Sequence, residues 1–452
     1  MAKPQPFEAQ RPDARDLASR VLARVWSDDA YASAALDGEL SRGGLDSRDA
    51  ALATELVYGV LRTQALLESR LDRHIKTPTY RKQPAVRAHM LIAAYSILFL
   101  DRVPSFAAVS QAVSAIKRSS DRRVGGFANA VLRKVATAQQ DRATLRHSDC
   151  AAEATPRWLA KALRKVLGET GSNSYLCAGP IPPPIGLCLD PDEDRDTWLS
   201  RLSKASPGAE IRAGNISPRA VLLSRAGDLR KLPGAGDNWL VQEEGAQAVG
   251  LLAGGNPGEH VLDACAGRGN KSFLLKDAVG PNGKVDAADL HPNKLARLTQ
   301  ADRGRRIART FAIDWSQGVG QAPENYDRAL VDAPCTGSGT LRRRPEIALR
   351  LRPSDPARMA QLQETIMRRV ATRVRDGGRL IYAVCSVLEP ECEGVVRALQ
   401  TAGDGVRLEP AAFDTDLAHS LAPGETSLRL LPHQHGTDGY FIASFVVHRD
   451  RN

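Results

Sequence analysis

Apolar residues recur at intervals of three and four along residues 10–147, which is the spacing that puts them on one face of a helix. Leu17, Val21 and Val25 form one such series, and Leu56 and Val60 belong to a second. Asp46 precedes the second series and predicts its N-cap. Little of this region alternates with the period of two that strands require. We therefore predict an all-α bundle over residues 10–147.

Residues 148–240 have a different pattern. Four prolines fall between residues 180 and 184, and short apolar runs follow at Ile185–Leu189 and Ala220–Leu223. One amphipathic stretch, Asp196–Ser203, lies between these two runs. The pattern predicts a linker helix followed by a small α+β subdomain.

Residues 241–452 alternate short apolar runs with helix-like stretches. The runs are His260–Ala266, Lys284–Leu290, Thr310–Trp315, Arg328–Ala333 and Arg379–Val384, and the longest helix is Pro356–Arg375. This order is typical of a doubly wound, Rossmann-like α/β domain with a mostly parallel sheet. Two late runs, Ser427–Leu431 and Tyr440–Val447, are too close in sequence for a crossover helix. We expect them to form an antiparallel hairpin at an edge of the sheet.

Length and composition fit a multidomain globular protein. The chain has 452 residues, which suits two or three domains, and 42% of them are hydrophobic and 25% charged. These values exclude collagen, a disordered chain and a coiled-coil rod. The longest apolar stretch, Met90–Leu100, is 11 residues long, whereas a membrane span needs about 20. The N-terminal segment lacks the apolar core of a signal peptide, so we expect a cytoplasmic protein.

Most of the positive charge lies in the helical region. The chain carries a net charge of +10, and residues 1–147 hold 23 Lys and Arg against 15 Asp and Glu. A basic domain suggests a polyanionic partner, although an Arg-rich solvated surface gives the same count. The seven cysteines form no C-x-x-C and no zinc-ligand spacing with histidine. We therefore expect no disulfide framework and no metal site.

The first strand of the α/β region runs into a glycine-containing loop, Asp263-Ala-Cys-Ala-Gly-Arg-Gly-Asn-Lys271. Gly267 and Gly269 allow a ligand to approach the backbone closely, at the start of a helix. Asp289 ends the next strand, where an acid accepts hydrogen bonds from ribose hydroxyls. Asp314 follows the third strand and either meets an adenine amino group or caps a turn. The loop lacks the third glycine of the dinucleotide fingerprint, so a nicotinamide-dependent oxidoreductase stays an alternative to other adenosine cofactors.

Two cysteines follow neighbouring runs of the predicted sheet. Asp332-Ala-Pro-Cys335 ends the fourth run, and Cys385 ends the fifth. Ligands of open α/β sheets bind at the carboxyl ends of the strands, so adjacent strands would direct both thiols into one crevice. A cysteine in a strand is otherwise a small buried hydrophobe, which is our interpretation of Cys265 and Cys188. Spacing alone leaves both interpretations open for Cys335 and Cys385.

Several motifs carry a family resemblance. The segments VLDACAGRGNKS, AADLHPNKL, VDAPCTGSGTLRRRPEI and IYAVCSVLEPE are similar to successive motifs of the Sun-type (RsmB/Fmu) RNA (cytosine-5)-methyltransferases, with further similarity at QEEGAQ (242–247) and HGTDGYFIASF (435–445). The segments LVYGVLR, LDRVPSFAAVSQAV and GGFANAVLRK resemble a helical NusB-like RNA-binding domain. This pair of domains is similar to the family branch that methylates small-subunit (16S) ribosomal RNA.

The resemblance implies a domain assignment and a role for each site residue. The domains are a NusB-like bundle (10–147), a linker subdomain (148–240) and a methyltransferase domain (241–452) that binds S-adenosyl-L-methionine. Cys385 is implied to attack C6 of cytosine, Asp332 to bond its N3/N4 edge, and Cys335 to assist release. The implied cofactor residues are Cys265, Ala266, Gly267, Arg268, Gly269, Asn270, Lys271, Asp289, Asp314 and Asp332. We expect 16S ribosomal RNA as partner, no membrane, and a monomer without an obligate protein partner.

The sequence departs from the family pattern at several places. The usual loop reads C-A-A-P-G-G-K, and here Arg268 replaces the proline and Asn270 a glycine. Val384 stands where threonine is usual, and Cys392 where asparagine is usual. A non-catalytic RNA-binding assembly factor with an altered cofactor loop is therefore an alternative, and a transfer-RNA methyltransferase is another. We also predict that Arg342, Arg343 and Arg344 contact RNA phosphates.

Overall fold

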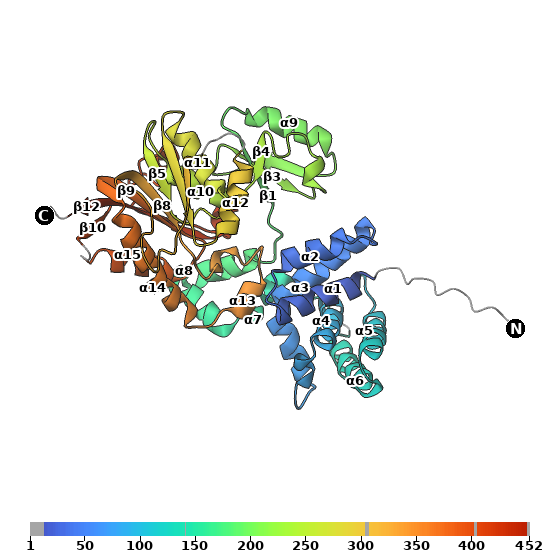
Figure 1. Ribbon diagram of the computed structural model, residues 1–452. Helices are drawn as coiled ribbons and strands as arrows, with labels where there is room; N and C mark the ends of the chain where they lie inside the picture. Colours follow the sequence, from blue (N-terminus) through green and yellow to red (C-terminus); the bar gives the residue numbers. More distant parts are fainter. Residues whose placement is uncertain (1–12, 141, 303–306, 402–404, 450–452) are drawn as a thin grey trace. The chain divides into compact units, whose positions relative to one another are not determined.

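The computed structural model describes residues 13–140, 142–302, 307–401 and 405–449. Residues 10–12 of the predicted bundle lie outside the described residues. The chain divides into two compact units, coloured along the sequence in Figure 1. The helical unit comprises Met1–Ile181 and Leu341–Arg350, and the sheet unit comprises Pro182–Thr340 and Leu351–Asn452. The chain therefore passes between the units at three points.

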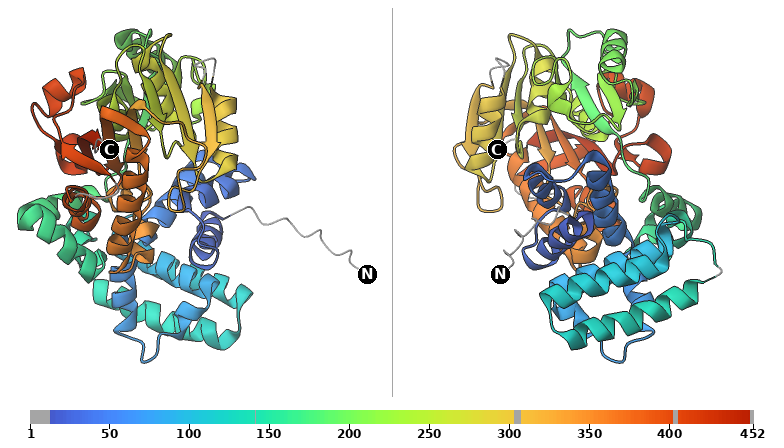
Figure 2. Two further views of the ribbon diagram at one scale, coloured as in Figure 1. Left: turned by 60° about the vertical axis from the view of Figure 1, so that its left-hand side comes forward. Right: turned by 90° about the vertical axis from the view of Figure 1, so that its right-hand side faces the viewer.

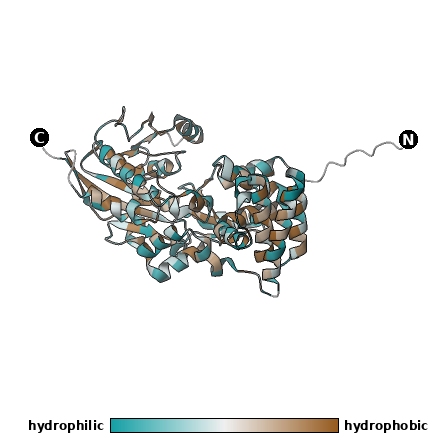
Figure 3. Ribbon diagram, turned by 90° about the horizontal axis from the view of Figure 1, so that it is seen from below, coloured by the Kyte–Doolittle hydropathy of each residue, from teal (hydrophilic) through white to brown (hydrophobic). Residues whose placement is uncertain are grey.

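Helices alone build the described part of the helical unit, as predicted. They are α1 (Ala14–Ser27), α2 (Ala32–Ser41), α3 (Ser47–Asp72), η1 (Thr79–Lys82), α4 (Pro84–Phe99), α5 (Ser105–Ser119), α6 (Arg122–Gln139), α7 (His147–Ala154), α8 (Arg157–Ala178) and α13 (Glu346–Arg350). The Asp46 carboxylate accepts a hydrogen bond from the backbone N–H of Asp49 at 2.8 Å, which confirms the predicted cap of α3. Hydrophobic and hydrophilic residues alternate along these helices (Figure 3), and α5 and α6 lie side by side (Figure 2).

The segment Leu341–Arg350 completes the helical unit although it comes from far along the chain. The Glu346 carboxylate is 1% exposed and accepts a hydrogen bond from the N–H of Ala32, the first residue of α2, at 3.1 Å. Tyr31, the N-cap of α2, supplies no side-chain bond of its own. Arg350 donates from Nη2 to the carbonyl oxygens of Val25 at 2.9 Å and Ala30 at 2.6 Å. These contacts satisfy helix-end groups that would otherwise lack partners.

The sheet unit begins with the small α+β subdomain that the sequence predicts. Its antiparallel sheet has the order β2-β3-β1-β4, and α9 (Arg195–Ala205) packs against it. The strands are β1 (Ile185–Leu189), β2 (Glu210–Ala213), β3 (Ala220–Ser224) and β4 (Trp239–Val241), with η2 (Leu229–Lys231) between the last two. Trp198 and Trp239 lie in its core. Cys188 is 5% exposed in β1, which confirms it as a small buried hydrophobe.

The large sheet has the order β10-β12-β9-β8-β5-β6-β7, with β11 paired to β12 (Figure 1). Its strands are β5 (His260–Asp263), β6 (Lys284–Asp289), β7 (Arg309–Ala312), β8 (Tyr326–Asp332), β9 (Val374–Val384), β10 (Val406–Pro410), β11 (Ser427–Leu430) and β12 (Tyr440–Arg449). Its helices are α10 (Glu244–Ala253), α11 (Asn270–Val279), α12 (Pro292–Ala301), η3 (Ser338–Thr340), α14 (Asp355–Ala371), η4 (Glu389–Glu391), α15 (Glu393–Leu399), α16 (Asp416–Leu421) and α17 (Pro432–His435).

Side chains from the same strands enter two different cores, one on each face of the large sheet. Val331 of β8 packs in the cluster that contains Met367 of α14, whereas its neighbour Leu330 packs in the cluster that contains Leu252 of α10. This alternation follows from the two-residue period of a strand. The sheet is therefore covered on both faces, as expected for a Rossmann-like domain.

The predicted late antiparallel hairpin is present at one edge of the sheet. Strands β11 and β12 pair antiparallel as expected. One side of β12 pairs with β9, and the other side pairs first with β11 and then with β10, so β11 and β10 together form this edge. Strand β10 was not predicted, because it is five residues long, carries Arg407 and Glu409, and ends in proline. Proline is tolerated mainly at sheet edges.

None of the helices in the described part of the chain combines the length and apolar character that crossing a membrane requires.

Candidate active site

The thiols of Cys335 and Cys385 meet at the carboxyl ends of β8 and β9. These strands are parallel neighbours, with Asp332 in register with Ala383. Cys335 follows β8 by three residues and Cys385 follows β9 directly, and their sulfur atoms are 3.3 Å apart. Both side chains are half-buried. The hydrogen bond to Cys385, and then burial, raise the pKa of Cys335 well above its ordinary value. Cys335 therefore holds its proton and can donate it to the sulfur of Cys385.

An ion pair joins the cofactor loop to the end of β8. Lys271, in the first turn of α11, lies with its Nζ 2.6 Å from Oδ2 of Asp332. Burial lowers the pKa of Lys271, but the Asp332 carboxylate outweighs this effect and the pKa is raised overall. The ammonium therefore stays charged, and it fixes the carboxylate beside the two thiols.

The predicted cofactor loop spans the ends of three parallel strands. The N–H of Ala264 donates to Leu330 of β8, and the N–H of Ala266 donates to Ala288 of β6. Gly267 and Gly269 have φ of 58° and 89°, in the left-handed region that favours glycine. A Cβ on Gly267 would meet no atom within 4 Å, so open space lies above this part of the loop.

Two buried carboxylates, those of Asp289 and Asp263, accept hydrogen bonds from this loop and from the start of α11. Asp289 is 7% exposed and accepts hydrogen bonds from the N–H of Gly267 at 2.9 Å and of His291 at 2.8 Å. Asp263 is 1% exposed and accepts from the Ser272 hydroxyl at 2.7 Å, while its Oδ1 has no hydrogen-bond partner in the described structure. Burial raises the pKa of Asp263 to about 7. A buried polar atom without a partner fits a site that a ligand completes.

The substituted loop positions do not obstruct this space. Arg268 is exposed, and Asn270 is half-buried and donates to the carbonyl of Val241 at 3.3 Å. Cys265 is half-buried against the core, in agreement with the interpretation as a small hydrophobe, and burial raises its pKa well above the ordinary value.

Asp314 lies two residues beyond β7 and caps a turn. Its Oδ1 accepts hydrogen bonds from the N–H of Ser316 at 2.8 Å and from the Ser316 hydroxyl at 2.6 Å, and these bonds lower its pKa. Of the two interpretations that the sequence left open, the structure therefore contains the turn cap. The side chain is exposed, so the adenine contact stays a prediction.

The arginine run after Cys335 is not a free charged surface. Arg342 is 7% exposed, and its carbonyl accepts a hydrogen bond from Arg62 at 3.0 Å within the helical unit. The guanidinium of Arg344 lies 5.0 Å from the ring centre of Tyr31. The prediction that all three side chains contact phosphates is therefore wrong for Arg342, because packing in the helical unit buries it. Of the three arginines, only Arg344 is exposed.

A polar network that the sequence did not predict lies behind the two thiols. It centres on the buried carboxylate of Glu391, which contacts residues next to both cysteines. The only sequence signal was the motif CSVLEPEC, in which Glu391 follows Cys385 by six residues.

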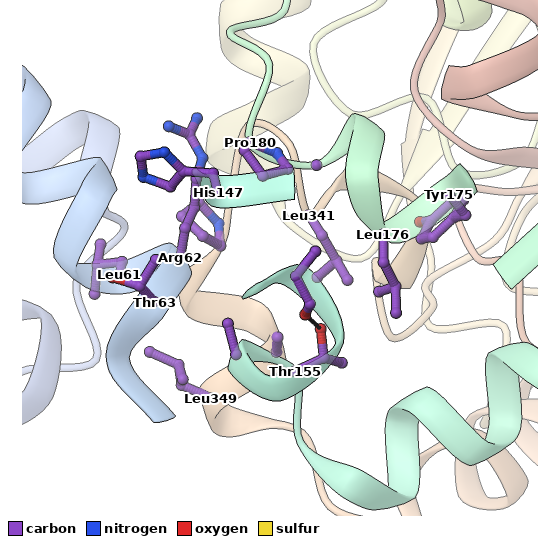
Figure 4. Close-up of a pocket in the computed structure, with 15 residues that line it drawn as sticks. Leu61, Arg62, Thr63, His147, Thr155, Tyr175, Leu176, Pro180, Leu341 and Leu349 are labelled. Carbon is purple, nitrogen blue, oxygen red and sulfur yellow. Dashed lines mark hydrogen bonds between the residues drawn. The ribbon is translucent and has the colours of Figure 1, made fainter. Parts of the chain in front are cut away.

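The cavities described next lie away from the thiols. One, of about 80 Å³, lies within the helical unit between α3, α7, α8 and the segment Leu341–Arg350, and Figure 4 shows Arg62 and His147 among its mostly apolar lining. It is smaller than the roughly 300 Å³ that organic ligands usually need. The other, of about 720 Å³, includes Asn256 and Arg328, near the amino ends of β5 and β8. It therefore lies at the opposite end of the strands from Cys335 and Cys385.

Comparison with known proteins adds two family matches. The model described as 16S rRNA methyltransferase RsmB/F matches residues 251–446, and the NusB family model matches residues 12–137. The chain is 30% identical over 449 residues to the probable ribosomal RNA small subunit methyltransferase B of Bacillus subtilis, covering 95% of this chain and 98% of that protein. It is 31% identical over 413 residues to ribosomal RNA small subunit methyltransferase B of Escherichia coli O157:H7, covering 89% and 91%.

Two solved structures share the fold. The crystal structure of PH0851 aligns with a TM-score of 0.78 at 21% identity, over 97% of this chain and 99% of that one. The structure of NSun6 from Pyrococcus horikoshii with SFG aligns with a TM-score of 0.54 at 15% identity, over 66% and 99%. At these identities the likeness concerns the fold alone.

Proposed function

The chain belongs to the 16S rRNA methyltransferase RsmB/F family, and from that premise we propose that it methylates C5 of a cytosine in 16S ribosomal RNA through a covalent adduct. The observation that carries this proposal is the pair of thiols 3.3 Å apart at the ends of β8 and β9, beside the Lys271–Asp332 ion pair. We assign residues 10–147 to RNA binding, 148–240 to a linker and 241–452 to methyl transfer.

The chemistry explains why two thiols are useful. C5 of cytosine is a poor nucleophile, because the ring is aromatic and neutral. After losing its proton to solvent, the Cys385 thiolate adds to C6 while the C5–C6 π bond breaks, which removes the aromaticity and places the electron pair on C5. S-adenosylmethionine, when bound, would supply the methyl group to C5 from its sulfonium and would leave as S-adenosylhomocysteine. The covalent route thus replaces one difficult step by two easier ones.

Release reverses the first bond. The C5 proton leaves to a base, its bonding electrons re-form the C5–C6 double bond, and Cys385 departs from C6 as a thiolate. Cys335 lies within hydrogen-bond distance of that sulfur and holds its proton. Its S–H can therefore donate to the departing thiolate.

Asp332 and Lys271 recognise the base and stabilise charge in this scheme. Asp332 bonds the N3/N4 edge of cytosine, and Lys271 keeps the carboxylate in place. Fixed charges of this kind stabilise the density that develops on the ring during attack. The target base must leave its stack to reach the site, which costs least in single-stranded or loop RNA.

The residues of the loop fit S-adenosylmethionine. Its backbone at Gly267 borders open space, Asp289 ends the second strand, and Asp263 has a buried oxygen without a partner. Cys265, Ala266, Arg268, Gly269 and Asn270 complete the loop that would hold the cofactor, and Asp314 would meet the adenine.

We expect S-adenosylhomocysteine to stabilise the protein against heat and NAD to have no effect. At 100 times its Kd, a ligand that binds only the folded state raises the unfolding free energy by about 2.7 kcal/mol. Asp289→Ala should abolish this shift, whereas Asp416→Ala, which removes an exposed carboxylate on α16, should keep it. Differential scanning fluorimetry measures the effect. A shift with NAD instead would support the oxidoreductase.

The helical unit is proposed to bind RNA through exposed cations. Lys117 and Arg133 line a groove of about 460 Å³ between α5 and α6, together with Phe106, which is 79% exposed. Replacing both cations by alanine should weaken RNA binding and reduce the slope of log K against log salt by about 1.4, because each single-strand phosphate contact contributes about 0.7. The control is Lys204→Ala with Lys231→Ala, an equal charge loss in the sheet unit. Equal slopes for both double variants would contradict the assignment.

Bisulfite sequencing of ribosomal and transfer RNA, from cells with and without the protein, tests the function as a whole. We expect one protected cytosine in 16S RNA to lose protection when the protein is absent. Loss of protection in transfer RNA would support the alternative substrate. If no cytosine changes and purified protein transfers no methyl group, the non-catalytic assembly factor is the better interpretation.

A further inference from the structure

A single buried carboxylate connects the loops that carry the two thiols. Glu391 is 0% exposed and ends η4, six residues after Cys385. Its Oε1 accepts hydrogen bonds from the N–H of Thr336 at 2.8 Å and from Nε2 of Gln363 at 3.1 Å. Its Oε2 accepts from the Thr336 hydroxyl at 2.5 Å and from the Ser386 hydroxyl at 2.7 Å.

Two of the residues that donate to Glu391 directly follow the two cysteines in the sequence. Thr336 is the residue after Cys335, and Ser386 is the residue after Cys385. One carboxylate therefore restrains the backbone immediately beyond each sulfur-bearing residue. The Ser338 and Ser386 hydroxyls lie 2.9 Å apart, and the N–H of Gly339 donates to the Cys385 carbonyl at 2.9 Å, so the two loops are joined again nearby.

Helix α14 supports this carboxylate from the core. Gln363 is 0% exposed, and its Nε2 also donates to the carbonyl of Pro334 at 2.9 Å, just before Cys335. Its Oε1 accepts from the hydroxyl of Tyr382 at 2.9 Å, and the same hydroxyl lies 2.6 Å from the Glu391 carbonyl. The residues on both sides of Cys335, and the residue after Cys385, are therefore bonded to one network.

Stability alone is a poor explanation for this arrangement. Burial raises the pKa of Glu391, and neutral donors lower it only in part. Its hydrogen-bond partners in the described structure are amides and hydroxyls rather than a lysine or arginine. A buried charge of this kind costs desolvation energy that an apolar side chain would not. Its bonds, however, define a geometry that apolar contacts would leave loose.

We propose that Glu391 is a positioning residue that sets the separation of the Cys335 and Cys385 sulfur atoms. This inference rests on the proposed roles of the two thiols and adds the group that holds them together. A displacement of about 1 Å in a reacting group can cost on the order of 100-fold in rate. The carboxylate touches no reacting atom and acts through Thr336 and Ser386.

Two substitutions of Glu391 should distinguish the effect of its negative charge from the effect of its hydrogen-bond geometry. Glu391→Ala removes all four bonds, and we expect kcat to fall about 100-fold while KM for RNA and the Kd of S-adenosylhomocysteine stay within about twofold. Glu391→Gln keeps an oxygen toward the Thr336 N–H, and its amide faces two hydroxyls that can accept as well as donate. Glu391→Gln should therefore retain kcat within about tenfold. Glu393→Ala is the matched control, because its carboxylate is 43% exposed and pairs with Arg429.

A readout that needs no methyl transfer tests the geometry itself. Dibromobimane bridges two thiols only when they lie close together, and peptide mapping by mass spectrometry identifies the bridged pair. We expect a Cys335–Cys385 bridge in the wild type, Glu391→Gln and Glu393→Ala, and a strongly reduced yield in Glu391→Ala. If Glu391→Ala does not fold, Gln363→Leu, which removes the supporting amide, should show the same loss in weaker form.

The outcomes distinguish the two proposals. An unchanged bridge yield and an unchanged kcat in Glu391→Ala would overturn the positioning role. So would a loss of kcat accompanied by an equal loss of S-adenosylhomocysteine binding, because that indicates general disruption. A bridge that depends on Glu391, in a protein that methylates no RNA, would uphold the positioning role and reject the proposed function.

Discussion

Cys385→Ala should reduce methyl transfer to background and abolish any covalent complex with RNA. The substitution removes the sulfur that bonds C6, and without that bond C5 gains no nucleophilic character. Losses on the order of 10⁴-fold or more in kcat are typical when a covalent nucleophile is removed. Transfer of a radiolabelled methyl group to unmodified 16S RNA measures the product, and denaturing electrophoresis detects the adduct.

The matched control for this variant is Cys177→Ala. Cys177 is also a half-buried thiol, but it lies in the helical unit and contacts the Ser148 carbonyl. The control should keep full activity, and both variants should still be stabilised by S-adenosylhomocysteine. Product formed by Cys385→Ala at the wild-type rate would remove the basis for a covalent mechanism.

Cys335→Ala should have the opposite effect on the adduct. The Cys385 sulfur remains available to attack, but the S–H that lies 3.3 Å from it is gone. Attack and methyl transfer can then proceed while release slows, so RNA should stay bound to the protein through denaturation. We expect a nearly stoichiometric adduct and less than one turnover per enzyme molecule, measured in the same electrophoretic assay.

The double variant Cys335→Ala with Cys385→Ala serves as the control for trapping. It should form no adduct, because the attacking sulfur is absent. Normal turnover by Cys335→Ala would show that the assigned roles are wrong. An adduct that survives in the double variant would show that another cysteine attacks.

The helices and strands that a regular spacing of apolar residues marks could be predicted from the sequence. The parallel pairing of β8 and β9 followed from two apolar runs and the tendency of consecutive strands to be neighbours, and it placed both thiols at one edge. The positions of β10 and β12 could not be predicted in this way, because strand order depends on tertiary packing. The same holds for Glu391, whose bonds reach Thr336 at a sequence distance of 55 residues.

The contact between Asp332 and Lys271 could not be predicted from the sequence either. The sequence assigned Lys271 to the cofactor loop through its motif, but its ammonium points to Asp332 at 2.6 Å. The two residues lie 61 positions apart, and only the folded sheet brings them together. Residue type and strand position were thus predictable, whereas the partner of each charged group was not.

The Leu341–Arg350 segment has a consequence for how the protein is made. In the described part of the chain, Glu346 accepts the hydrogen bond of the Ala32 N–H, and Arg350 donates to the carbonyls of Val25 and Ala30. A ribosome translating at 5–20 residues per second needs roughly 10 to 30 s to go from residue 181 to residue 350. During that interval the nascent helical bundle is incomplete, and its final closure coincides with synthesis of the peptide that leads out of the Cys335 loop.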